Sequence, residues 1–318
     1  MNPNGDRNVF LIIDGNAIMH RAYHAIPNFS TSTGIPTGAV YGFFSMLLKL
    51  FQEIKPSYLA ITFDRPKPTF RQALFVGYQA QRPKMDDGLA GQIKNVHSIL
   101  EKAVICVYEV DGFEADDVIG SIADQVQSSK FKVQSLETII VSGDRDLLQL
   151  VNSSTKILAP VLGISKMVLF DEERVMKNYN LEPGQIVDYK ALAGDSSDNY
   201  SGVPGVGPKT ASKLIKQYGT IENMYQNIDK IKVENEGLAQ KLLNGSEMAI
   251  LAKKLAAIDK NVPFSFNMDD CKVENIEKDG FKNAFFEFEL MSLSKRIDGI
   301  FGAKVSGEKK KRVQMELL

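Results

Sequence analysis

Four runs of continuous apolar residues in the first half of the chain predict a buried parallel sheet. Strands that are apolar at every position are typical of parallel sheets, which helices cover on both faces. Helical patterns at Gly38–Glu53 and Ala115–Gln127 supply that cover. The pattern therefore predicts an α/β fold with a mainly parallel central sheet. The four predicted strands are Val9–Asp14, Tyr58–Asp64, Val104–Val110 and Thr138–Asp144.

The second half of the chain has a mainly helical pattern. Lys156–Pro160 and Lys166–Phe170 flank Gly163 and predict a hairpin at the edge of the sheet. From Glu172 to about residue 260 the periodicity is helical, and an aromatic-rich helix at Phe281–Leu293 is expected to pack back on the sheet. We therefore divide the chain into an α/β catalytic domain over residues 1–171, a helical subdomain over 172–295 and a tail or linker over 296–318.

The segment between the second and third predicted strands, residues 65–103, is far longer than a usual strand-to-helix connection. It is basic and broken by proline, with the runs Arg65–Arg71 and Tyr78–Lys84. Long loops at the mouth of a crevice often act as lids or clamps. We expect this segment to cover one end of the sheet.

Acidic residues cluster where the predicted strands end. Three strands run directly into an aspartate, and further acidic pairs follow the strand ends or stand three apart along the chain. In an open α/β sheet the carboxyl ends of the strands line the ligand crevice, so these acids are expected to converge. The acids are Asp14, Asp64, Glu114, Asp116, Asp117, Asp144, Asp146, Asp195 and Asp198.

So many negative charges in one crevice are unfavourable unless cations neutralise them or some of the acids bind protons. Oxygen ligands without histidine or cysteine favour Mg²⁺ or Mn²⁺ over zinc. Taken singly, Glu114 and Asp116, or Asp144 and Asp146, equally suit acids at helix N-termini. Four separate acidic groups at one end of the sheet make shared metal binding the better explanation. We therefore predict a site for two or more divalent ions.

The stretch Gly194–Thr210 adds a turn that suits a phosphate. Its glycines supply backbone freedom and uncovered amides, Pro208 suits the first position of a helix, and Lys209 follows at the helix N-terminus. A nucleotide P-loop is excluded, because its lysine follows the glycine directly and Pro208 intervenes here. A plain surface turn is the alternative. The residues expected to contact phosphate or DNA are Gly202, Gly205, Gly207, Lys209 and Thr210.

The overall composition narrows the class of protein. The 318 residues are 44% hydrophobic and 24% charged, which is typical of a globular protein with one large or two unequal domains. The sequence contains neither an apolar run of about twenty residues nor a secretory signal, so we expect a cytoplasmic protein. Cys106 and Cys271 are too few for a disulfide framework or a zinc site.

The net charge of −1 conceals a local imbalance. Setting the nine clustered acids aside leaves 38 basic residues against 39 minus 9, or 30, acidic ones. A basic exterior around an acidic crevice suits a nucleic acid that is bound through cations.

Four motifs together give the chain a specific resemblance: Ile12–Asn16, Phe113–Gly120, Ser142–Leu150 and Gly194–Thr210. With them the sequence resembles the 5′ nuclease (5′-3′ exonuclease) domain of bacterial DNA polymerase I and, more broadly, the flap endonuclease family, from Val9 to about Lys295. The resemblance implies a PIN-like fold with a helical arch over about residues 65–103 and a glycine-rich helical hairpin over about 194–218.

The resemblance also implies residue roles. All nine family acid positions carry acids here, so two divalent ions are expected, one to activate water and one to steady the leaving oxygen. The single-stranded 5′ end is expected to pass through the arch, where Arg71 and Arg82 approach its phosphates. The hairpin is expected to hold duplex DNA and a K⁺ ion. Lys209, Lys213 and Lys216 recur at helical spacing and either track the duplex backbone or form a solvated face.

One position departs from the family pattern. The arch commonly reads Tyr-Lys-x-x-Arg, whereas here Gln79 stands between Tyr78 and Arg82. The family lysine is expected to help hold the scissile phosphate, and Lys84 is the residue that could compensate. Without compensation, slower turnover with intact metal and duplex binding is expected. Tyr23 is expected either to stack on a base of the 5′ strand or to pack under its helix.

We therefore predict a structure-specific 5′-3′ exonuclease and 5′ flap endonuclease that leaves a 5′-phosphate and a 3′-hydroxyl. Its expected partner is double-stranded DNA with a 5′ flap or end, or an RNA primer–DNA hybrid. We expect the protein to act as a monomer, associated with the nucleoid, in replication and repair. Two alternatives stay open. One is a catalytically weak DNA-binding protein of the same fold, and the other is a ribonuclease, against which the hairpin and the long arch weigh.

Overall fold

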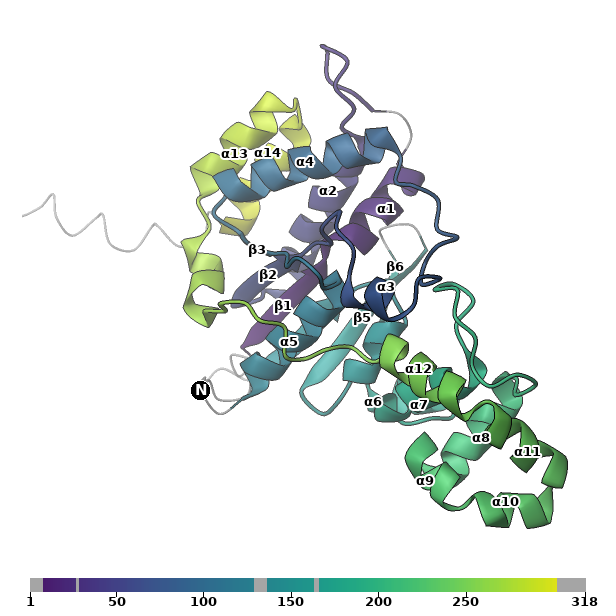
Figure 1. The fold of residues 1–318 in the computed structure, drawn as a ribbon. Coiled ribbons are helices and arrows are strands. Elements are labelled where there is room, and N and C mark those ends of the chain that lie inside the picture. Colours follow the sequence, from purple (N-terminus) through teal and green to yellow (C-terminus); the bar gives the residue numbers. More distant parts are fainter. Residues whose placement is uncertain (1–7, 27–28, 129–135, 163–165, 302–318) are drawn as a thin grey trace, which may run out of the picture.

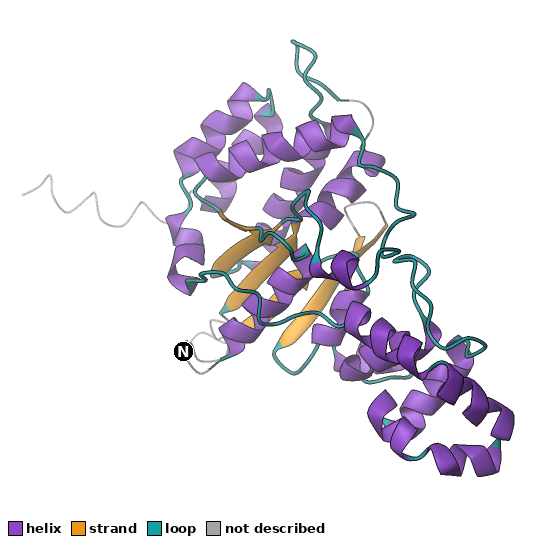
Figure 2. Ribbon diagram, in the orientation of Figure 1, coloured by secondary structure: helices purple, strands orange, loops and turns teal. Residues whose placement is uncertain are grey.

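The computed structural model describes residues 8–26, 29–128, 136–162 and 166–301. In these residues one sheet has the strand order β3-β2-β1-β4-β5-β6, with helices on both faces (Figure 1, Figure 2). All neighbouring strands are parallel except β5 and β6, which form the predicted edge hairpin. The predicted α/β fold is confirmed. The strands are β1 (Val9–Asp14), β2 (Tyr58–Thr62), β3 (Cys106–Tyr108), β4 (Glu137–Val141), β5 (Thr155–Leu162) and β6 (Lys166–Phe170).

The central strand β1 separates two hydrophobic cores, because successive side chains point to opposite faces of a sheet. Leu11 and Ile13 pack in the first core, and Phe10 and Ile12 pack in the second. The second core is covered by α5 (Ala115–Gln127) and by the short 3-10 helix η1 (Asp146–Leu150). The first core is covered by α1 (Gly15–Ala25), α2 (Gly38–Ile54), α4 (Asp87–Lys102), α13 (Lys278–Glu287) and α14 (Met291–Phe301).

A helical lobe with its own apolar core projects from one side of the sheet, shown in green in Figure 1. Its last helix, α12 (Ser246–Ala256), packs against α7 (Ile186–Ala193), and Leu255 of α12 lies in a small apolar cluster with Tyr78 and Tyr200. This contact ties the lobe to the α/β domain. The other helices of this half are α6 (Glu172–Tyr179), η2 (Pro183–Gln185), α7 (Ile186–Ala193), α8 (Pro208–Tyr218), α9 (Ile221–Gln226), α10 (Ile228–Glu234) and α11 (Glu236–Asn244).

Two elements differ from the sequence prediction. The strand predicted at Val104–Val110 is only β3, because Val104 adopts a left-handed φ of 54° and lies outside the ladder. The helix predicted at Phe281–Leu293 is two helices. Glu289, between α13 and α14, has a left-handed φ of 57°, which interrupts the helical backbone. Its expected packing is confirmed, because Phe281 and Phe285 lie fully buried in the first core.

The segment predicted as an arch, residues 65–103, divides into two parts. Its first part contains only one short helix, α3 (Phe70–Leu74), followed by turns. Its second part is α4, whose Leu89, Val96 and Ile99 are buried in the first core. Only residues up to about 86 therefore cover the crevice, and we call residues 65–86 the crevice loop.

The C-terminal boundary also lies later than expected. The tail was placed from residue 296, but α14 continues to Phe301 with Ile297 buried. The basic run Gly307–Arg312 falls outside the described residues. Of the helices that the structure describes, none has the length and apolar character to cross a membrane.

Candidate metal centre and nucleic-acid interface

An acidic crevice of about 170 Å³ lies at the carboxyl ends of the strands. It opens beside β1 and β4, where the strand order reverses, and such points are the usual ligand sites of open α/β sheets. Seven of the nine predicted acids line it, together with Arg82 and Gln79 of the crevice loop. These seven are Asp14, Asp64, Glu114, Asp116, Asp144, Asp146 and Asp198.

Asp14 lines the crevice as both the last residue of β1 and the N-cap of α1. Its carboxylate accepts hydrogen bonds from the Ala17 amide at 2.9 Å and from the Ser142 hydroxyl at 2.6 Å. Burial, reinforced by the charges of Asp64 and Asp144, raises the pKa of Asp14 to about 7 in spite of these hydrogen bonds. A buried carboxylate with its oxygens aimed at other acids favours a proton or a cation.

The start of α5 contributes the next acids. Glu114 is the N-cap of α5, and Asp64 accepts a hydrogen bond from the Ala115 amide at 2.7 Å, which fixes the end of β2 against this helix. Burial raises the pKa of Glu114 to about 7, although Arg71 opposes that shift. Burial and the neighbouring aspartates raise the pKa of Asp116 as well. Several carboxyl groups thus hold protons more tightly than in water, as expected for acids that are buried beside one another.

A second acidic group lies beside the first. Carboxylate oxygens of Asp146, Asp195 and Asp198 lie within 4.8 Å of one another, and the three residues come from η1 and from the turn after α7. Burial raises the pKa of Asp146 to about 6. Lys190 of α7 contacts Asp146 and donates to Asp195 Oδ2 at 2.5 Å. The donor set of both groups consists of carboxylate oxygens, which fits a hard divalent cation such as Mg²⁺ or Mn²⁺.

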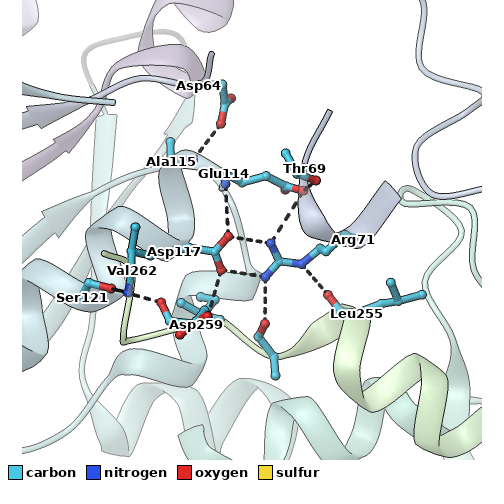
Figure 3. Close-up of polar contacts among 12 residues, drawn as sticks. Asp64, Thr69, Arg71, Glu114, Ala115, Asp117, Ser121, Leu255, Asp259 and Val262 are labelled. Atoms are coloured by element: carbon cyan, nitrogen blue, oxygen red, sulfur yellow. Dashed lines mark hydrogen bonds and ion pairs between the residues drawn. The ribbon is translucent and has the colours of Figure 1, made fainter. Parts of the chain in front are cut away.

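Asp117 was expected to bind a metal ion, but its carboxylate is paired with Arg71. Its side chain is fully buried, and Figure 3 shows both carboxylate oxygens engaged by the guanidinium group of Arg71 at 2.7 and 2.8 Å. The amides of Asp259 and Glu114 complete its hydrogen bonds at 2.9 and 3.1 Å. On the first turn of α5, Asp117 follows Asp116, which lines the crevice, by one residue, or about 100° around the helix, and it is absent from the crevice lining.

Arg71 is a predicted phosphate contact whose donors are taken by groups of the protein itself. Only 3% of its side chain is exposed, and its remaining donors bind the backbone oxygens of Leu255 at 2.8 Å and Ala257 at 2.7 Å. Although burial opposes the charge, Asp117 holds the pKa of Arg71 above its usual value. Arg71 therefore lines the crevice with its donors already paired, and it joins the crevice loop to α5 and to the end of α12.

Arg82 and Gln79 do face the crevice. Arg82 donates to Asp198 Oδ1 at 2.6 Å with its side chain 53% exposed. The Gln79 amide nitrogen lies 3.3 Å from Asp198 Oδ1 and 3.5 Å from Glu114 Oε2. Lys84 is fully on the surface and is absent from the crevice lining, so the structure does not bring it to the place of the family lysine.

The predicted hairpin is formed by α7, a turn at residues 194–207 and α8. Gly202 is buried there, and a Cβ atom at this position would lie 2.2 Å from the Leu192 carbonyl oxygen. Glycine is therefore needed for close packing and does not lie on the surface where a phosphate would bind. Gly205 has φ 76° and, like Gly207, lies exposed at the turn. Lys209 and Lys213 are exposed on α8, and Thr210 is half-buried between them. Their side chains are free to meet a surface ligand.

Aromatic and histidine residues near the crevice have separate partners. Tyr23 donates from its hydroxyl to Asp86 Oδ1 at 2.7 Å and packs partly against the first core, which supports the packing role. His20 lines the crevice, and burial lowers its pKa. Tyr78 is buried, with its hydroxyl 3.3 Å from both Glu114 and Asp198.

The sequence does not predict a role for Lys190, which pairs with the crevice acid Asp146, or for Tyr78, which lines the crevice. A lysine in a helix is usually solvated, and only its position five residues before Asp195, across the end of α7, hinted at a contact with that acid. Tyr78 was noted only as part of the arch motif. Both depend on contacts between segments that are distant in the sequence.

Comparisons with known proteins agree with this geometry. A family model described as 5′-3′ exonuclease, N-terminal resolvase-like domain, matches residues 9–180, and one described as 5′-3′ exonuclease, C-terminal SAM fold, matches residues 181–279. A 5′-3′ exonuclease of Aquifex aeolicus is 38% identical over 91% of this chain and 95% of its own length. DNA polymerase I of Caldicellulosiruptor bescii is 39% identical over 90% of this chain and 33% of its own length. The chain thus spans about a third of such polymerases.

Solved structures share the fold at low sequence identity. A structure of T5 5′-exonuclease with bound zinc is 18% identical, with a TM-score of 0.63 over 93% of this chain and 99% of that chain. The catalytic core of Rad2 in complex with a DNA substrate is 16% identical, with a TM-score of 0.56 over 92% of this chain and 91% of that chain. These similarities show the fold of the chain.

Proposed function

Because the chain belongs to the 5′-3′ exonuclease family, we propose that it is a metal-dependent 5′-3′ exodeoxyribonuclease and 5′ flap endonuclease. The observation that carries this proposal is the convergence of seven carboxylates at the carboxyl ends of the strands, beneath the basic crevice loop. An anionic DNA backbone would be repelled by such a crevice unless divalent cations lay between them. The proposed reaction is hydrolysis of DNA phosphodiesters near a 5′ end or flap junction.

Two groups of acids would hold the cations. Asp14, Asp116 and Asp144 line the crevice together, and the charge of Asp116 interacts with those of the other two, so we treat them as one group. Asp146, Asp195 and Asp198, whose carboxylate oxygens lie within 4.8 Å of one another, form the other. Mg²⁺ or Mn²⁺ ions bound there would supply Lewis-acid stabilisation of the phosphodiester and of its leaving oxygen. Ser142 and the Ala17 amide orient Asp14, while the Ala115 amide orients Asp64. These neutral donors keep the carboxylates fixed before substrate binds.

The crevice loop would hold the strand to be cut. Arg82 is half-exposed above Asp198, so its guanidinium group can bind a phosphate without leaving the crevice mouth. Gln79 offers a neutral donor at the position where the family commonly has a lysine. Lys84 is on the surface of the same loop and would contact DNA outside the crevice, as would Tyr23 if its ring stacks on a base.

The hairpin would bind the duplex part of the substrate. The exposed turn at Gly205 and Gly207 leads into the N-terminus of α8, where backbone amides attract phosphate. Lys209 and Lys213 extend this surface by one helical turn. We also propose that a K⁺ ion binds at the turn. The protein would act as a monomer on DNA or on RNA primer–DNA hybrids. It would work at the nucleoid in replication and repair.

A labelled flap substrate tests the proposal. The parent should cut a 5′-labelled DNA flap near the junction with Mg²⁺ and should stop when a chelator is added. The Asp144→Ala/Asp146→Ala variant should lose at least about a thousandfold in rate, since it removes acids from both groups. Asp229→Ala, a change at an exposed acid on α10, is the control and should keep parental activity. Equal cutting by the parent and the double variant would refute the active-site assignment.

Gln79 favours one alternative function. A neutral side chain beside Asp198 and Glu114 binds a phosphate less strongly than an ammonium group does. If the parent binds a flap tightly but does not cut it with Mg²⁺ or Mn²⁺, a structure-specific DNA-binding role becomes the better reading. A single-stranded RNA substrate run in parallel distinguishes the ribonuclease alternative.

A further inference from the structure

Lys190 places a fixed positive charge inside the acidic crevice region. It lies in the last turn of α7, and its ammonium group contacts the carboxylate of Asp146 and donates to Asp195 Oδ2 at 2.5 Å. Only 14% of its side chain is exposed. The ammonium group therefore takes the place, between two carboxylates, that a cation would otherwise take.

The acids that Lys190 contacts belong to the group whose oxygens lie within 4.8 Å of one another, Asp146, Asp195 and Asp198. The third member, Asp198, is bonded to Arg82. A divalent ion that takes oxygens from Asp146 and Asp195 must displace the ammonium group or stay within a few ångströms of it. Since like charges at that distance repel strongly, Lys190 and a divalent ion compete for the same oxygens.

The other acidic group has different neighbours. Asp14 accepts from the Ser142 hydroxyl and the Ala17 amide, and Asp144 Oδ1 accepts from the Asp146 amide at 2.8 Å. These donors are neutral, so they orient the carboxylates without opposing a cation. The two groups are therefore expected to differ in their affinity for the same ion.

The positive charge of Lys190 is balanced by the two carboxylates that it contacts, those of Asp146 and Asp195. The three groups thus form an ion-paired cluster that a competing cation has to open.

We propose that Lys190 is an internal counter-cation that weakens divalent-ion binding at the Asp146–Asp195–Asp198 group, so that the crevice has one strong and one weak cation site. The proposal deepens the proposed function, on which it rests for the presence of divalent ions. It makes Lys190 a positioning residue, because it acts on ion occupancy and not on the phosphodiester.

Mn²⁺ binding to the full chain without DNA tests the proposal. Free Mn²⁺ counted by electron paramagnetic resonance, with calorimetry beside it, should give a strong and a weak class of site in the parent. Lys190→Met should tighten the weak class by at least about tenfold and leave the strong class within about twofold, because it removes the competing charge. Lys190→Arg keeps the charge and should keep the weak class weak.

A matched control separates this effect from the loss of any buried lysine. Lys253 bridges Asp188 at 2.6 Å and Glu222 at 2.8 Å in the helical lobe, outside the crevice. Lys253→Met should leave both classes of Mn²⁺ site unchanged. If Lys190→Met leaves the affinity of the weak class of Mn²⁺ site unchanged or lowers it, Lys190 only supports the local structure and the proposal is overturned.

Thermal unfolding gives a second readout that does not depend on a binding isotherm. In chelator, Lys190→Met should unfold at a lower temperature than the parent, since its acids lose their counter-charge, and added Mn²⁺ should raise its Tm by more than it raises that of the parent. An equal or smaller rise contradicts the proposal. A protein that follows these binding results yet cuts no DNA would keep this proposal and reject the proposed function.

Discussion

Arg71 and Asp117 form a two-pronged ion pair, with N–O distances of 2.7 and 2.8 Å, in which 3% of one side chain and none of the other is exposed. The pair joins the crevice loop to the first turn of α5, and Arg71 also binds the carbonyl oxygens at the end of α12 (Figure 3). Three segments distant in the sequence are therefore fixed to one another directly beneath the acidic crevice.

Breaking this pair should destabilise the fold. Arg71→Met leaves the Asp117 charge buried without its partner, and the loss of a buried partner costs about 3–5 kcal/mol. Urea unfolding in chelator measures the change. Arg71→Met/Asp117→Leu should lose less stability than Arg71→Met alone, because no uncompensated charge remains. A variant Arg71→Met that is as stable as the parent but binds DNA poorly would instead support a phosphate contact.

The metal-free protein should lose stability as the pH rises from about 4 to about 7. Burial raises the pKa of Asp14 and Glu114 to about 7 and that of Asp146 to about 6. A group with a raised pKa binds its proton more tightly in the folded state, so its stabilising contribution is complete below the unfolded pKa and is lost as the pH passes the folded pKa. Thermal unfolding in chelator at pH 5 and pH 8 checks the direction.

Two further samples sharpen that measurement. Mg²⁺ at pH 8 should restore the Tm, because a cation then replaces the lost protons. Asp14→Asn should flatten the pH dependence, since it removes one titrating group while it keeps the oxygen that accepts from the Ala17 amide. A Tm in chelator that rises from pH 5 to pH 8 would mean that the acids are not held close together in the free protein.

Gln79→Lys should raise the rate of flap cleavage. The Gln79 amide already lies 3.3 Å from Asp198, so an ammonium group at this position would reach the crevice mouth. A charged donor to a phosphate is about twice as strong as a neutral one, which corresponds to about tenfold in single-turnover rate. Ala80→Lys adds the same charge at the neighbouring exposed residue and should give little gain. Equal rates for Gln79→Lys and the parent would show that the lysine is not limiting here.

Lys213→Ala should weaken duplex binding and reduce its dependence on salt. If Lys213 contacts one phosphate, the slope of log K against log salt concentration should fall by about 0.9. Lys282→Ala is the control, because Lys282 lies on α13 and pairs with Asp298 at 2.6 Å. Binding to a blunt duplex at several salt concentrations gives both slopes. An unchanged slope for Lys213→Ala would place the duplex elsewhere on the lobe.

The sequence by itself determined the sheet and the meeting place of the acids. β1 and β2 are apolar at every position but the last, and β4 ends in the apolar run Ile139–Val141. Such strands suit a sheet that is covered on both faces, and parallel strands bring their carboxyl ends to one edge. Asp14 at the end of β1 and Asp144 after β4 could therefore be placed in one crevice from their position along the chain. A local pattern is enough to predict this arrangement because every parallel strand places its carboxyl end at the same edge of the sheet.

Only the tertiary structure decided what each charged side chain faces. Asp116 and Asp117 are neighbours in the sequence, yet Asp116 lines the crevice and Asp117 binds Arg71, 46 residues away. Lys190 has the spacing of an ordinary helical lysine, but the turn after α7 returns Asp195 to its ammonium group. The energy of a buried charge depends on the partners that the fold brings within about 4 Å. Such partners come from other segments, so no local pattern specifies them.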